Sequence, residues 1–283
     1  MQQVHTVDEL RSAVAAWRRA GESVALVPTM GNLHDGHMSL VSLAAAHAER
    51  IVVSVFVNPT QFGPNEDFDS YPRTLDQDSR KLAEVGVGLL FVPSVREVYP
   101  RDVSLSTIVS VPEITDQLCG AHRPGHFDGV TSVVCRLFNI CSPDVAVFGQ
   151  KDYQQLVVLR QMVADLHLPV TLIAAPTARS RNGLALSSRN GGLSEEDRQT
   201  ACAIFETLEF IASELRRGRR DFVTLQAEAI ELISASGLEP DYVEIRTADT
   251  LRAPAADSAR LVVLIAARIG GVRLIDNLLV DPG

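Results

Sequence analysis

Two continuous runs of apolar, β-branched residues constrain the fold more than any other feature of this 283-residue chain. Residues 23–28 (SVALVP) and 51–57 (IVVSVFV) contain almost no polar side chain, which is typical of strands buried on both faces of a parallel sheet. Between them, residues 37–48 carry apolar side chains at helical spacing. This order predicts a strand–helix–strand unit, whose connection should be right-handed.

The same alternation continues as far as residue 174. We expect further helices at 75–85, 130–140 and 153–166, and further strands at 89–92, 145–148 and 170–174. Alternation of this kind is typical of an α/β fold. The sequence therefore predicts a Rossmann-like, doubly wound parallel sheet.

The composition of the chain changes near Pro176. Residues 177–192 are rich in Arg, Ser, Asn and Gly, which predicts a long loop or hinge. After this loop we expect a helix from the N-cap Ser194 to about Arg217 and another at 222–235, then strands at 241–246, 261–267 and 272–277. Gly270–Gly271 is a hairpin signal between the last two strands. We therefore expect a Rossmann-like domain at 1–186 and a smaller C-terminal α+β domain at 187–283.

The charge of the chain disfavours one class of function. The formal net charge is −9, whereas a nucleic-acid binder needs a basic face. Only Lys81 and Lys151 are lysines among 26 basic residues, and we expect the Arg-rich stretch 216–220 to be solvated helix surface. The N-terminus lacks a basic and an apolar segment, and the longest apolar runs have strand length. We therefore expect no signal peptide, no membrane contact and a cytoplasmic location.

Residues 28–37 (PTMGNLHDGH) lie between an expected strand and an expected helix, where α/β folds bind ligands. Gly31 and Gly36 would let the backbone approach a phosphate, and a helix N-terminus offers N–H groups to an anion. His34 and His37 can donate hydrogen bonds to phosphate oxygens that gain charge during phosphoryl or nucleotidyl transfer. A metal site is the alternative, but zinc proteases space their two histidines four apart on one continuous helix.

Three further segments carry groups that could bind a ligand. Lys151 follows an expected strand and can reach phosphate from there, or it is an ordinary surface lysine. Residues 186–190 (LSSRN) could form a mobile clamp on a triphosphate, although most Ser-rich loops only connect elements. Gln61, within residues 58–63 (NPTQFG), could recognise a small polar substrate by a donor and an acceptor.

Together these segments resemble the pantothenate synthetases, the pantoate–β-alanine ligases of the His-x-Gly-His nucleotidyltransferase superfamily. The resemblance extends from residue 28 to residue 277. It also includes YPRTL at 71–75, RPGHF at 123–127, KDYQQL at 151–156, GLALSSRN at 183–190 and DYVE at 241–244. The departures are small, because Asn32 stands where Ala is common and Met38 where Leu is common.

The resemblance implies a two-step, ATP-dependent ligase. The pantoate carboxylate would attack the α-phosphorus of ATP, giving pantoyl adenylate and pyrophosphate, and the β-alanine amine would then attack the acyl carbon and release AMP. It implies that residues 1–186 bind nucleotide and pantoate, that residues 187–283 form a lid, and that the enzyme is a homodimer. It also implies that Mg²⁺ accompanies ATP, with Asp76, Asp78 and Asp152 left open as ligands.

The resemblance also assigns individual residues. The catalytic residues would be His34, His37, Lys151, Ser187, Ser188 and Arg189. ATP would contact Met30, Gly31, Asn32, Leu33, His34, Asp35, Gly36, His37, Gly149, Gln150, Lys151, Asp152, Ala178, Leu186, Ser187, Ser188 and Arg189. Gln61 and Gln155 would hold the pantoate or β-alanine substrate. In this family the second histidine is often described as a proton donor. We expect His37 to donate a hydrogen bond to phosphate instead, because adenylyl transfer requires charge stabilisation more than a proton.

Two other functions are compatible with the histidine pair. A transferase that ends at a nucleotidyl product would use it equally well, but would not explain Gln61 together with Gln155. A non-catalytic ATP sensor would bind nucleotide without exchanging pyrophosphate. Both hypotheses are weaker than the ligase, because neither accounts for all the motifs in their order.

Overall fold

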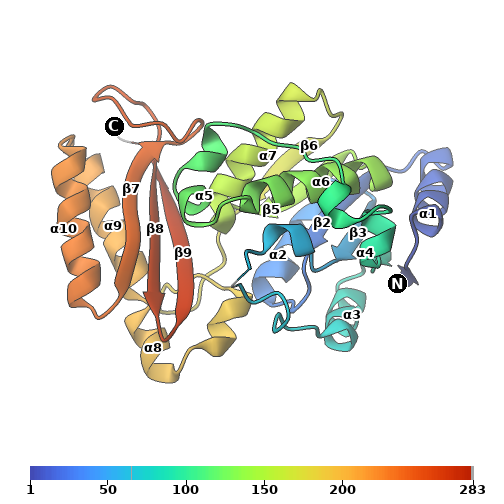
Figure 1. Ribbon diagram of the computed structural model, residues 1–283, viewed down its shortest axis with the longest axis horizontal. Helices are drawn as coiled ribbons and strands as arrows, with labels where there is room; N and C mark the ends of the chain where they lie inside the picture. The colour runs from blue at the N-terminus through green and yellow to red at the C-terminus, as the bar shows by residue number, and fades with distance from the viewer. Residues whose placement is uncertain (65, 282–283) are drawn as a thin grey trace. The chain divides into compact units, whose positions relative to one another are not determined.

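The computed structural model describes residues 1–64 and 66–281, which fold as two compact units (Figure 1). The first unit comprises Met1–Gly149 and Val158–Ala175, and the second comprises Gln150–Val157 and Pro176–Gly283. The change of unit after Ala175 coincides with the change in composition, whereas the expected domain boundary lay after residue 186. The inclusion of Gln150–Val157 in the second unit was not expected from the sequence.

The first unit contains a six-stranded parallel sheet with the strand order β1-β4-β3-β2-β5-β6. Its strands are β1 (Gln2–Val4), β2 (Val24–Thr29), β3 (Arg50–Val55), β4 (Leu89–Phe91), β5 (Val145–Gly149) and β6 (Thr171–Ala175). The Rossmann-like, doubly wound parallel sheet is thereby confirmed. The edge strand β1 was not predicted, because three residues are too few to show a period.

Helices follow the strands of this unit as a doubly wound sheet requires. They are α1 (Val7–Arg19), α2 (Asp35–Ala45), α3 (Leu75–Glu84), α4 (Val95–Val98), α5 (Cys119–His122), α6 (His126–Cys141) and α7 (Tyr153–Asp165), the last continuing from the second unit. Short 3-10 turns of this unit are η1 (Pro59–Gln61), η2 (Val103–Leu105) and η3 (Ile114–Asp116), whereas η4 (Gln150–Asp152) belongs to the second unit. The unpredicted helix α1 begins at a capping box of Thr6 and Glu9.

The central strands β2 and β3 are apolar because both of their faces are covered. Val27 and Val53 are paired in register and belong to one core cluster with Leu40 of α2 and Leu82 of α3. Side chains alternate along a strand, so Leu26 points to the opposite face, where it is also buried. The continuous apolar runs in the sequence are the direct consequence of this double burial.

The strand order reverses direction between β2 and β5. From β2 the chain proceeds to β3 on one side, and from β5 it proceeds to β6 on the other, while β2 and β5 pair directly at Ala25↔Val145. Such a switch point leaves a crevice outside the carboxyl ends of the two strands, where open α/β sheets bind ligands. The carboxyl end of β2 leads directly into the histidine segment.

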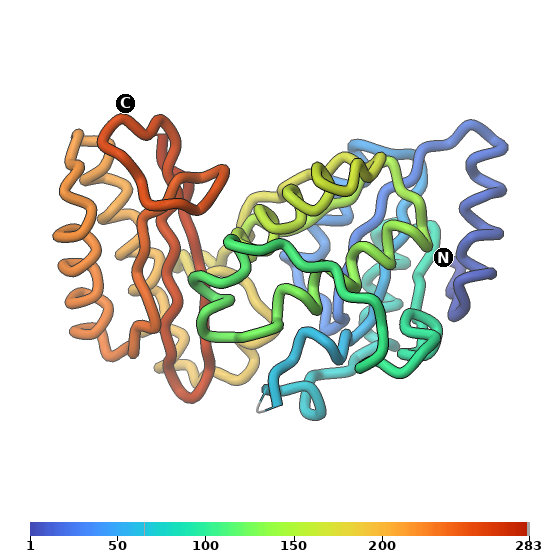
Figure 2. Tube along the Cα trace, turned by 45° about the horizontal axis from the view of Figure 1, so that its top comes forward, coloured from blue at the N-terminus to red at the C-terminus, as the bar shows by residue number. Residues whose placement is uncertain are grey.

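The second unit contains a three-stranded antiparallel sheet, β7 (Glu239–Thr247), β8 (Leu261–Ile269) and β9 (Val272–Val280), in that order. Figures 1 and 2 show α9 (Ala203–Arg216) and α10 (Phe222–Ala235) side by side on one side of this sheet. Gly270 and Gly271 form the predicted hairpin turn, and both have positive φ (56° and 76°), as a two-residue hairpin of this kind requires. The smaller α+β unit is confirmed.

The helix expected from residue 194 to residue 217 is two helices. Ser194 caps the first, α8 (Glu195–Thr200), by accepting a hydrogen bond from the backbone N–H of Asp197 at 3.0 Å, as predicted. A turn at Ala201 and Cys202 then separates α8 from α9. Both turn residues keep right-handed helical backbone angles, so the helical spacing of apolar residues continues through them. The sequence therefore does not reveal the break between α8 and α9.

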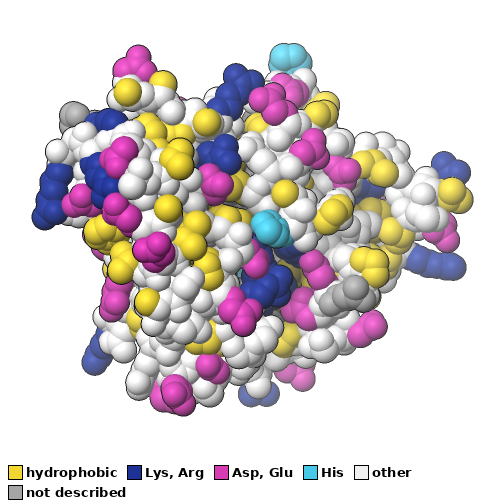
Figure 3. All heavy atoms as spheres, turned by 60° about the vertical axis from the view of Figure 1, so that its left-hand side comes forward, with side chains coloured by type: hydrophobic (Ala, Val, Ile, Leu, Met, Phe, Trp, Pro, Cys, Tyr) yellow, Lys and Arg dark blue, Asp and Glu magenta, His cyan; other side chains and the backbone are white. Residues whose placement is uncertain are grey.

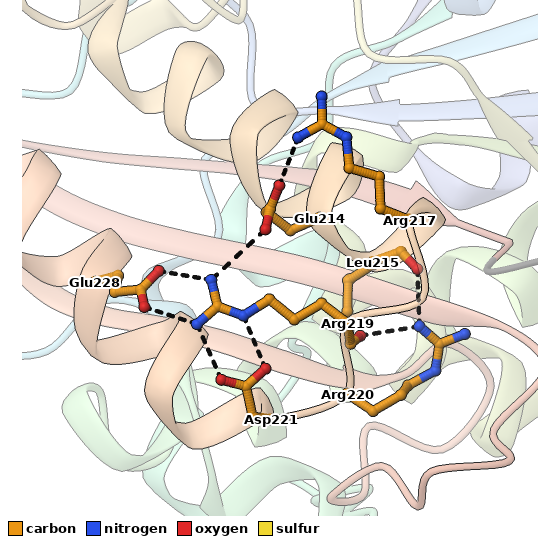
Figure 4. A network of polar contacts seen from close by, with 7 residues as sticks. All are labelled: Glu214, Leu215, Arg217, Arg219, Arg220, Asp221 and Glu228. Carbon is orange, nitrogen blue, oxygen red and sulfur yellow. Dashed lines mark hydrogen bonds and ion pairs between the residues drawn. The ribbon is translucent and has the colours of Figure 1, made fainter.

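The Arg-rich stretch 216–220 is not uniformly solvated, which corrects the expectation from composition. Arg219, whose side chain is 22% exposed, forms ion pairs with Glu214, Asp221 and Glu228 (Figure 4). Hydrogen bonds from Arg219 hold the pKa of both Asp221 and Glu228 below the ordinary value. The network connects the end of α9 to α10, whereas the neighbouring Arg217 is 75% exposed.

Basic and acidic side chains are interspersed with apolar ones on the face shown in Figure 3. Within residues 1–64 and 66–281, no helix is long and apolar enough to cross a bilayer.

Candidate active site

The histidine segment begins with a left-handed turn at the carboxyl end of β2. Gly31 and Asn32 both have positive φ, 83° and 52°. A Cβ atom on residue 31 would lie 3.1 Å from Val55 Cγ1 and 3.2 Å from Asp78 Oδ2, so both the backbone angle and the available space favour glycine. This glycine makes the turn possible, which is a more specific role than the expected approach to phosphate.

His34 and His37 form the N-terminal cap of α2. His34 is the N-cap residue, and its Nδ1 accepts a hydrogen bond from the backbone N–H of Gly36 at 3.2 Å. His37 forms the reciprocal hydrogen bond, in which its Nδ1 accepts from the backbone N–H of His34, also at 3.2 Å. The ring centroids lie 4.1 Å apart. The pair is thus a histidine version of the capping box usually formed by Ser or Thr with Glu.

This capping box determines which ring nitrogen of each histidine carries the proton. A backbone N–H can only donate, so each Nδ1 must present a lone pair. The proton of the neutral ring is therefore on Nε2, and each ring is held as a hydrogen-bond donor through Nε2–H. Both donors belong to the first turn of a helix, whose N-terminus itself attracts anions.

A buried amide network fixes Gln61 beside this turn. Asn58 is 1% exposed; its Nδ2 donates to Gln61 Oε1 at 3.1 Å and to the Gly129 carbonyl at 3.1 Å. Its Oδ1 accepts from the Tyr99 hydroxyl at 2.8 Å. Gln61 Nε2 then lies 3.0 Å from the sulfur of Met30, which adjoins the left-handed turn. The structure therefore brings Gln61 to the histidine segment and identifies Asn58 and Tyr99 as the residues that orient its amide.

The RPGHF motif lies on the other side of Gln61. His126 Nδ1 is 2.8 Å from the Gln61 carbonyl oxygen, and Arg123 donates to the same oxygen at 3.3 Å. Arg123 also forms two hydrogen bonds with Glu66, at 2.5 and 2.6 Å. Burial would raise the pKa of Glu66, but these bonds lower it below the ordinary value. A guanidinium group is thus present next to the proposed substrate-binding glutamine.

In the second unit, Lys151 lies in η4, which directly follows β5. Its side chain is 19% exposed, and its Nζ is 3.7 Å from Asp152 Oδ1. Asn277 of β9 holds this turn, because its Nδ2 donates to the carbonyls of Gln150 and Lys151 at 2.9 and 2.8 Å. Gln155 is half-buried in the first turns of α7. These contacts with β9 explain why Gln150–Val157 belongs to the second unit.

The expected loop at 177–192 is partly a β-hairpin. The backbone N–H of Leu186 donates to the Ala178 carbonyl at 2.8 Å, and Arg179 pairs with Ala185 in an antiparallel bridge. Two of the expected ATP contacts, Ala178 and Leu186, are therefore bonded to each other. Ser187 then caps η5 (Ser188–Gly192), accepting from the Arg189 backbone N–H at 3.3 Å. This segment has more internal hydrogen bonds than its composition indicated.

A buried ion pair anchors the hairpin to β9. Arg179 forms a bidentate pair with Asp276, which is 5% exposed, and its guanidinium lies 4.1 Å from the ring centroid of Phe205. Burial raises the pKa of Asp276 despite the opposing effect of Arg179. The functional segments expected from the sequence did not include Asp276 and Asn277. The signal for them is a pair of adjacent polar residues in the middle of a strand that is apolar apart from Arg273, and it becomes informative once both are known to be buried.

The three acids considered for magnesium differ in their surroundings. Asp78 is 1% exposed; its Oδ1 accepts from the Leu33 N–H at 2.8 Å, and its Oδ2 accepts from the Asn32 N–H at 2.9 Å and the Thr74 hydroxyl at 3.1 Å. Both oxygens therefore already accept hydrogen bonds from the protein, whereas Asp76 is exposed and the Asp152 side chain is 48% exposed. Among the described residues, no three His, Cys, Asp or Glu side chains form a group that could hold a metal ion.

The candidate site residues thus fall into two groups, each held within its own unit. Residues 30–37 and Gln61 lie together at the carboxyl end of β2. Lys151, Asp152 and Gln155 belong to the second unit with Ala178 and residues 186–189. Gly149, the last residue of β5, connects the two groups along the chain.

Comparison with known proteins gives a consistent result. The family model described as Pantoate-beta-alanine ligase matches residues 2–279. A pantothenate synthetase of Pseudomonas putida (strain W619) is 53% identical over 280 residues, covering 99% of this chain and 98% of that protein.

Solved structures agree over the whole length. The crystal structure of pantothenate synthetase from Thermus thermophilus is similar with a TM-score of 0.92 and 44% identity, covering 100% of both chains. The pantoate-beta-alanine ligase of Francisella tularensis, crystallised with beta-gamma ATP and beta-alanine, is similar with a TM-score of 0.82 and 36% identity, covering 99% of this chain and 97% of that one.

Proposed function

The chain belongs to the pantoate-beta-alanine ligase family, and from this premise we propose that it condenses pantoate with β-alanine at the expense of ATP. In the first step, an oxygen of the pantoate carboxylate forms a bond to the α-phosphorus of ATP, and pyrophosphate leaves. In the second, the β-alanine amine attacks the acyl carbon, loses a proton, and AMP leaves. The product is pantothenate.

The observation that carries this proposal is the reciprocal cap of His34 and His37. Adenylation brings two anions together, so the site must stabilise negative charge that increases at phosphorus-bound oxygens. Two Nε2–H donors, held by backbone hydrogen bonds at a helix N-terminus, suit that task because little reorganisation is needed during the reaction. We assign both histidines this hydrogen-bonding role, without proton transfer.

The positive groups of the second unit complete the charge balance in this proposal. Lys151 and Arg189 would bind phosphate oxygens, with the hydroxyls of Ser187 and Ser188. Backbone atoms of residues 30–37, 149–152 and 186–189, together with Ala178, would contact ATP. The hydrogen-bonded pair of Ala178 and Leu186 supports this assignment, because it holds two of these segments side by side in one hairpin.

Gln61 and Gln155 would bind pantoate. Gln61 already has its Oε1 engaged by Asn58, so its Nε2 is the end that can donate to a carboxylate or hydroxyl. The neighbouring Arg123 is paired with Glu66 and donates to the Gln61 carbonyl, so it would hold the backbone of Gln61 and leave the substrate to the glutamine amide. Mg²⁺ would enter with the triphosphate, mainly bound by phosphate oxygens and water. The homodimer is a part of the proposal that rests on the resemblance, whereas the cytoplasmic location rests on the sequence features given above.

The decisive assay measures AMP release with pantoate, ATP and β-alanine, each omitted in turn, together with pyrophosphate exchange into ATP. We expect pantoate-dependent exchange without β-alanine, and rapid AMP release only with all three substrates. Nucleotidyl transfer to another acceptor would release pyrophosphate but no AMP, with or without β-alanine. An ATP sensor would show no exchange, and either result would overturn the ligase proposal.

A further inference from the structure

Helix α3 contacts the histidine segment through two charged side chains on one of its faces. Asp78 and Lys81 are separated by about one helical turn, so they lie next to each other on the helix surface. Asp78 accepts from the Leu33 N–H, while Lys81 Nζ donates to the Leu33 carbonyl oxygen at 2.5 Å. The backbone amide N–H and the carbonyl of the residue immediately before His34 are therefore both held from α3.

The left-handed turn needs such restraint. Asn32 has φ 52°, which residues with a side chain seldom adopt, and its N–H is also bound by Asp78. A buried carboxylate is stable only when its oxygens are hydrogen-bonded, and here two backbone N–H groups and the Thr74 hydroxyl meet that requirement. Carboxylate and turn thus stabilise each other.

The restraint continues into the catalytic cap. Leu33 is anchored in the core at 3% exposure, and the peptide that follows it supplies the His34 N–H on which the His37 ring depends. A rotation of the Leu33 backbone would move the His34 N–H away from His37 Nδ1. It would thereby weaken the hydrogen bond that favours the Nε2–H form of this ring.

We propose that Asp78 and Lys81 are positioning residues, which hold residues 31–33 so that both imidazoles present Nε2–H to the reacting phosphate. The expected effect of Asp78 and Lys81 on the reaction rate rests on the proposed function. Their expected effect on the tautomers of the histidine rings does not. Asp78 is thereby assigned to the geometry of the site instead of to magnesium. Neither residue is required to touch a substrate.

Asp78→Asn tests the first contact, because the amide has nearly the same shape but places a donor against backbone donors. Lys81→Met removes the second contact, and Lys81→Arg restores a donor. Asp144→Asn is the matched control, since Asp144 accepts from the Val24 N–H at 2.7 Å and so supports the opposite end of the same strand β2. Each variant is examined by urea unfolding, by kcat and KM, and by two-bond ¹⁵N–¹H spectra of the histidine rings without substrates.

We expect Asp78→Asn and Lys81→Met to reduce kcat roughly 10- to 100-fold, because small displacements of catalytic groups have effects of this size. Their His34 and His37 signals should change from a single Nε2–H tautomer to a mixture, while KM for β-alanine stays the same. Lys81→Arg should recover most of kcat. Asp144→Asn should lose stability but keep wild-type kcat and ring signals.

The proposal is overturned if Asp78→Asn resembles Asp144→Asn in kcat and ring signals, since both would then be merely structural. If Asp78→Asn does not fold, the Lys81 variants decide the question. Equal kcat values for Lys81→Met, Lys81→Arg and the wild type would also overturn the proposal. A wild-type protein that forms no pantoyl adenylate would refute the proposed function. The ring spectra would still decide whether Asp78 and Lys81 position the histidines.

Discussion

The histidine cap allows catalysis and folding to be separated by choice of substitution. His34→Ala removes both the N-cap acceptor and the Nε2–H donor, whereas His34→Asn removes the donor but keeps a favourable N-cap side chain. In the same way His37→Gln keeps a side chain that can accept at the third position of a capping box. We predict that all three variants lose activity but that only His34→Ala loses appreciable stability.

The magnitudes follow from the two roles. Loss of a preorganised donor to a developing negative charge reduces kcat by roughly 10²- to 10³-fold, or about 3–4 kcal/mol. Loss of the N-cap contributes about 1 kcal/mol to the free energy of unfolding. His34→Asn and His34→Ala should therefore have similar kcat values, and their unfolding free energies should differ by about 1 kcal/mol.

Pre-steady-state formation of adenylate and urea unfolding on the same preparations provide the test. KM for ATP should change much less than kcat, because the donors act on charge that develops in the transition state. Wild-type kcat in His34→Asn would show that the ring is only a cap. Equal loss of stability in His34→Asn and His34→Ala would show that the side chain does not cap α2.

Three further predictions concern other parts of the chain. Gln61→Ala and Gln155→Ala should raise KM for pantoate with nearly unchanged ATP affinity, and calorimetry that finds an equal loss for ATP would contradict this. Arg189→Ala should slow adenylate formation, and ATP with pantoate should increase hydrogen-exchange protection at 183–190; unchanged protection would contradict a lid. Although burial raises it, hydrogen bonds from arginines lower the pKa of Asp241, so Asp241→Asn should be less stable than wild type by about 1 kcal/mol at pH 7. That difference should decrease as the pH falls below the ordinary carboxyl pKa and should be lost below the lowered pKa. A difference that does not change over the acid range would contradict the ion-pair origin.

Much of the fold could be predicted from residues close together in the sequence. The apolar runs that became β2 and β3, the Ser194 cap and the Gly270–Gly271 turn are local signals, because strand burial, capping and hairpin geometry each depend on a few consecutive residues. The histidine cap is local as well, with partners two and three residues apart. Its recognition as a ligand-binding segment therefore needed no knowledge of distant contacts.

The tertiary structure alone decided which distant groups support the site. Asp78 lies 46 positions from Asn32, and Asn277 lies 127 positions from Gln150. Asp76 and Asp78 both occur in the first turn of α3, and helical spacing places Asp78 on the apolar face with Leu75 and Leu82. The sequence does not show which groups meet that carboxylate: a carboxylate removed from water must find donors, and backbone N–H groups brought near it by folding must find acceptors. Such pairing is determined when strands and helices pack, because it depends on groups that are adjacent in space and far apart along the chain.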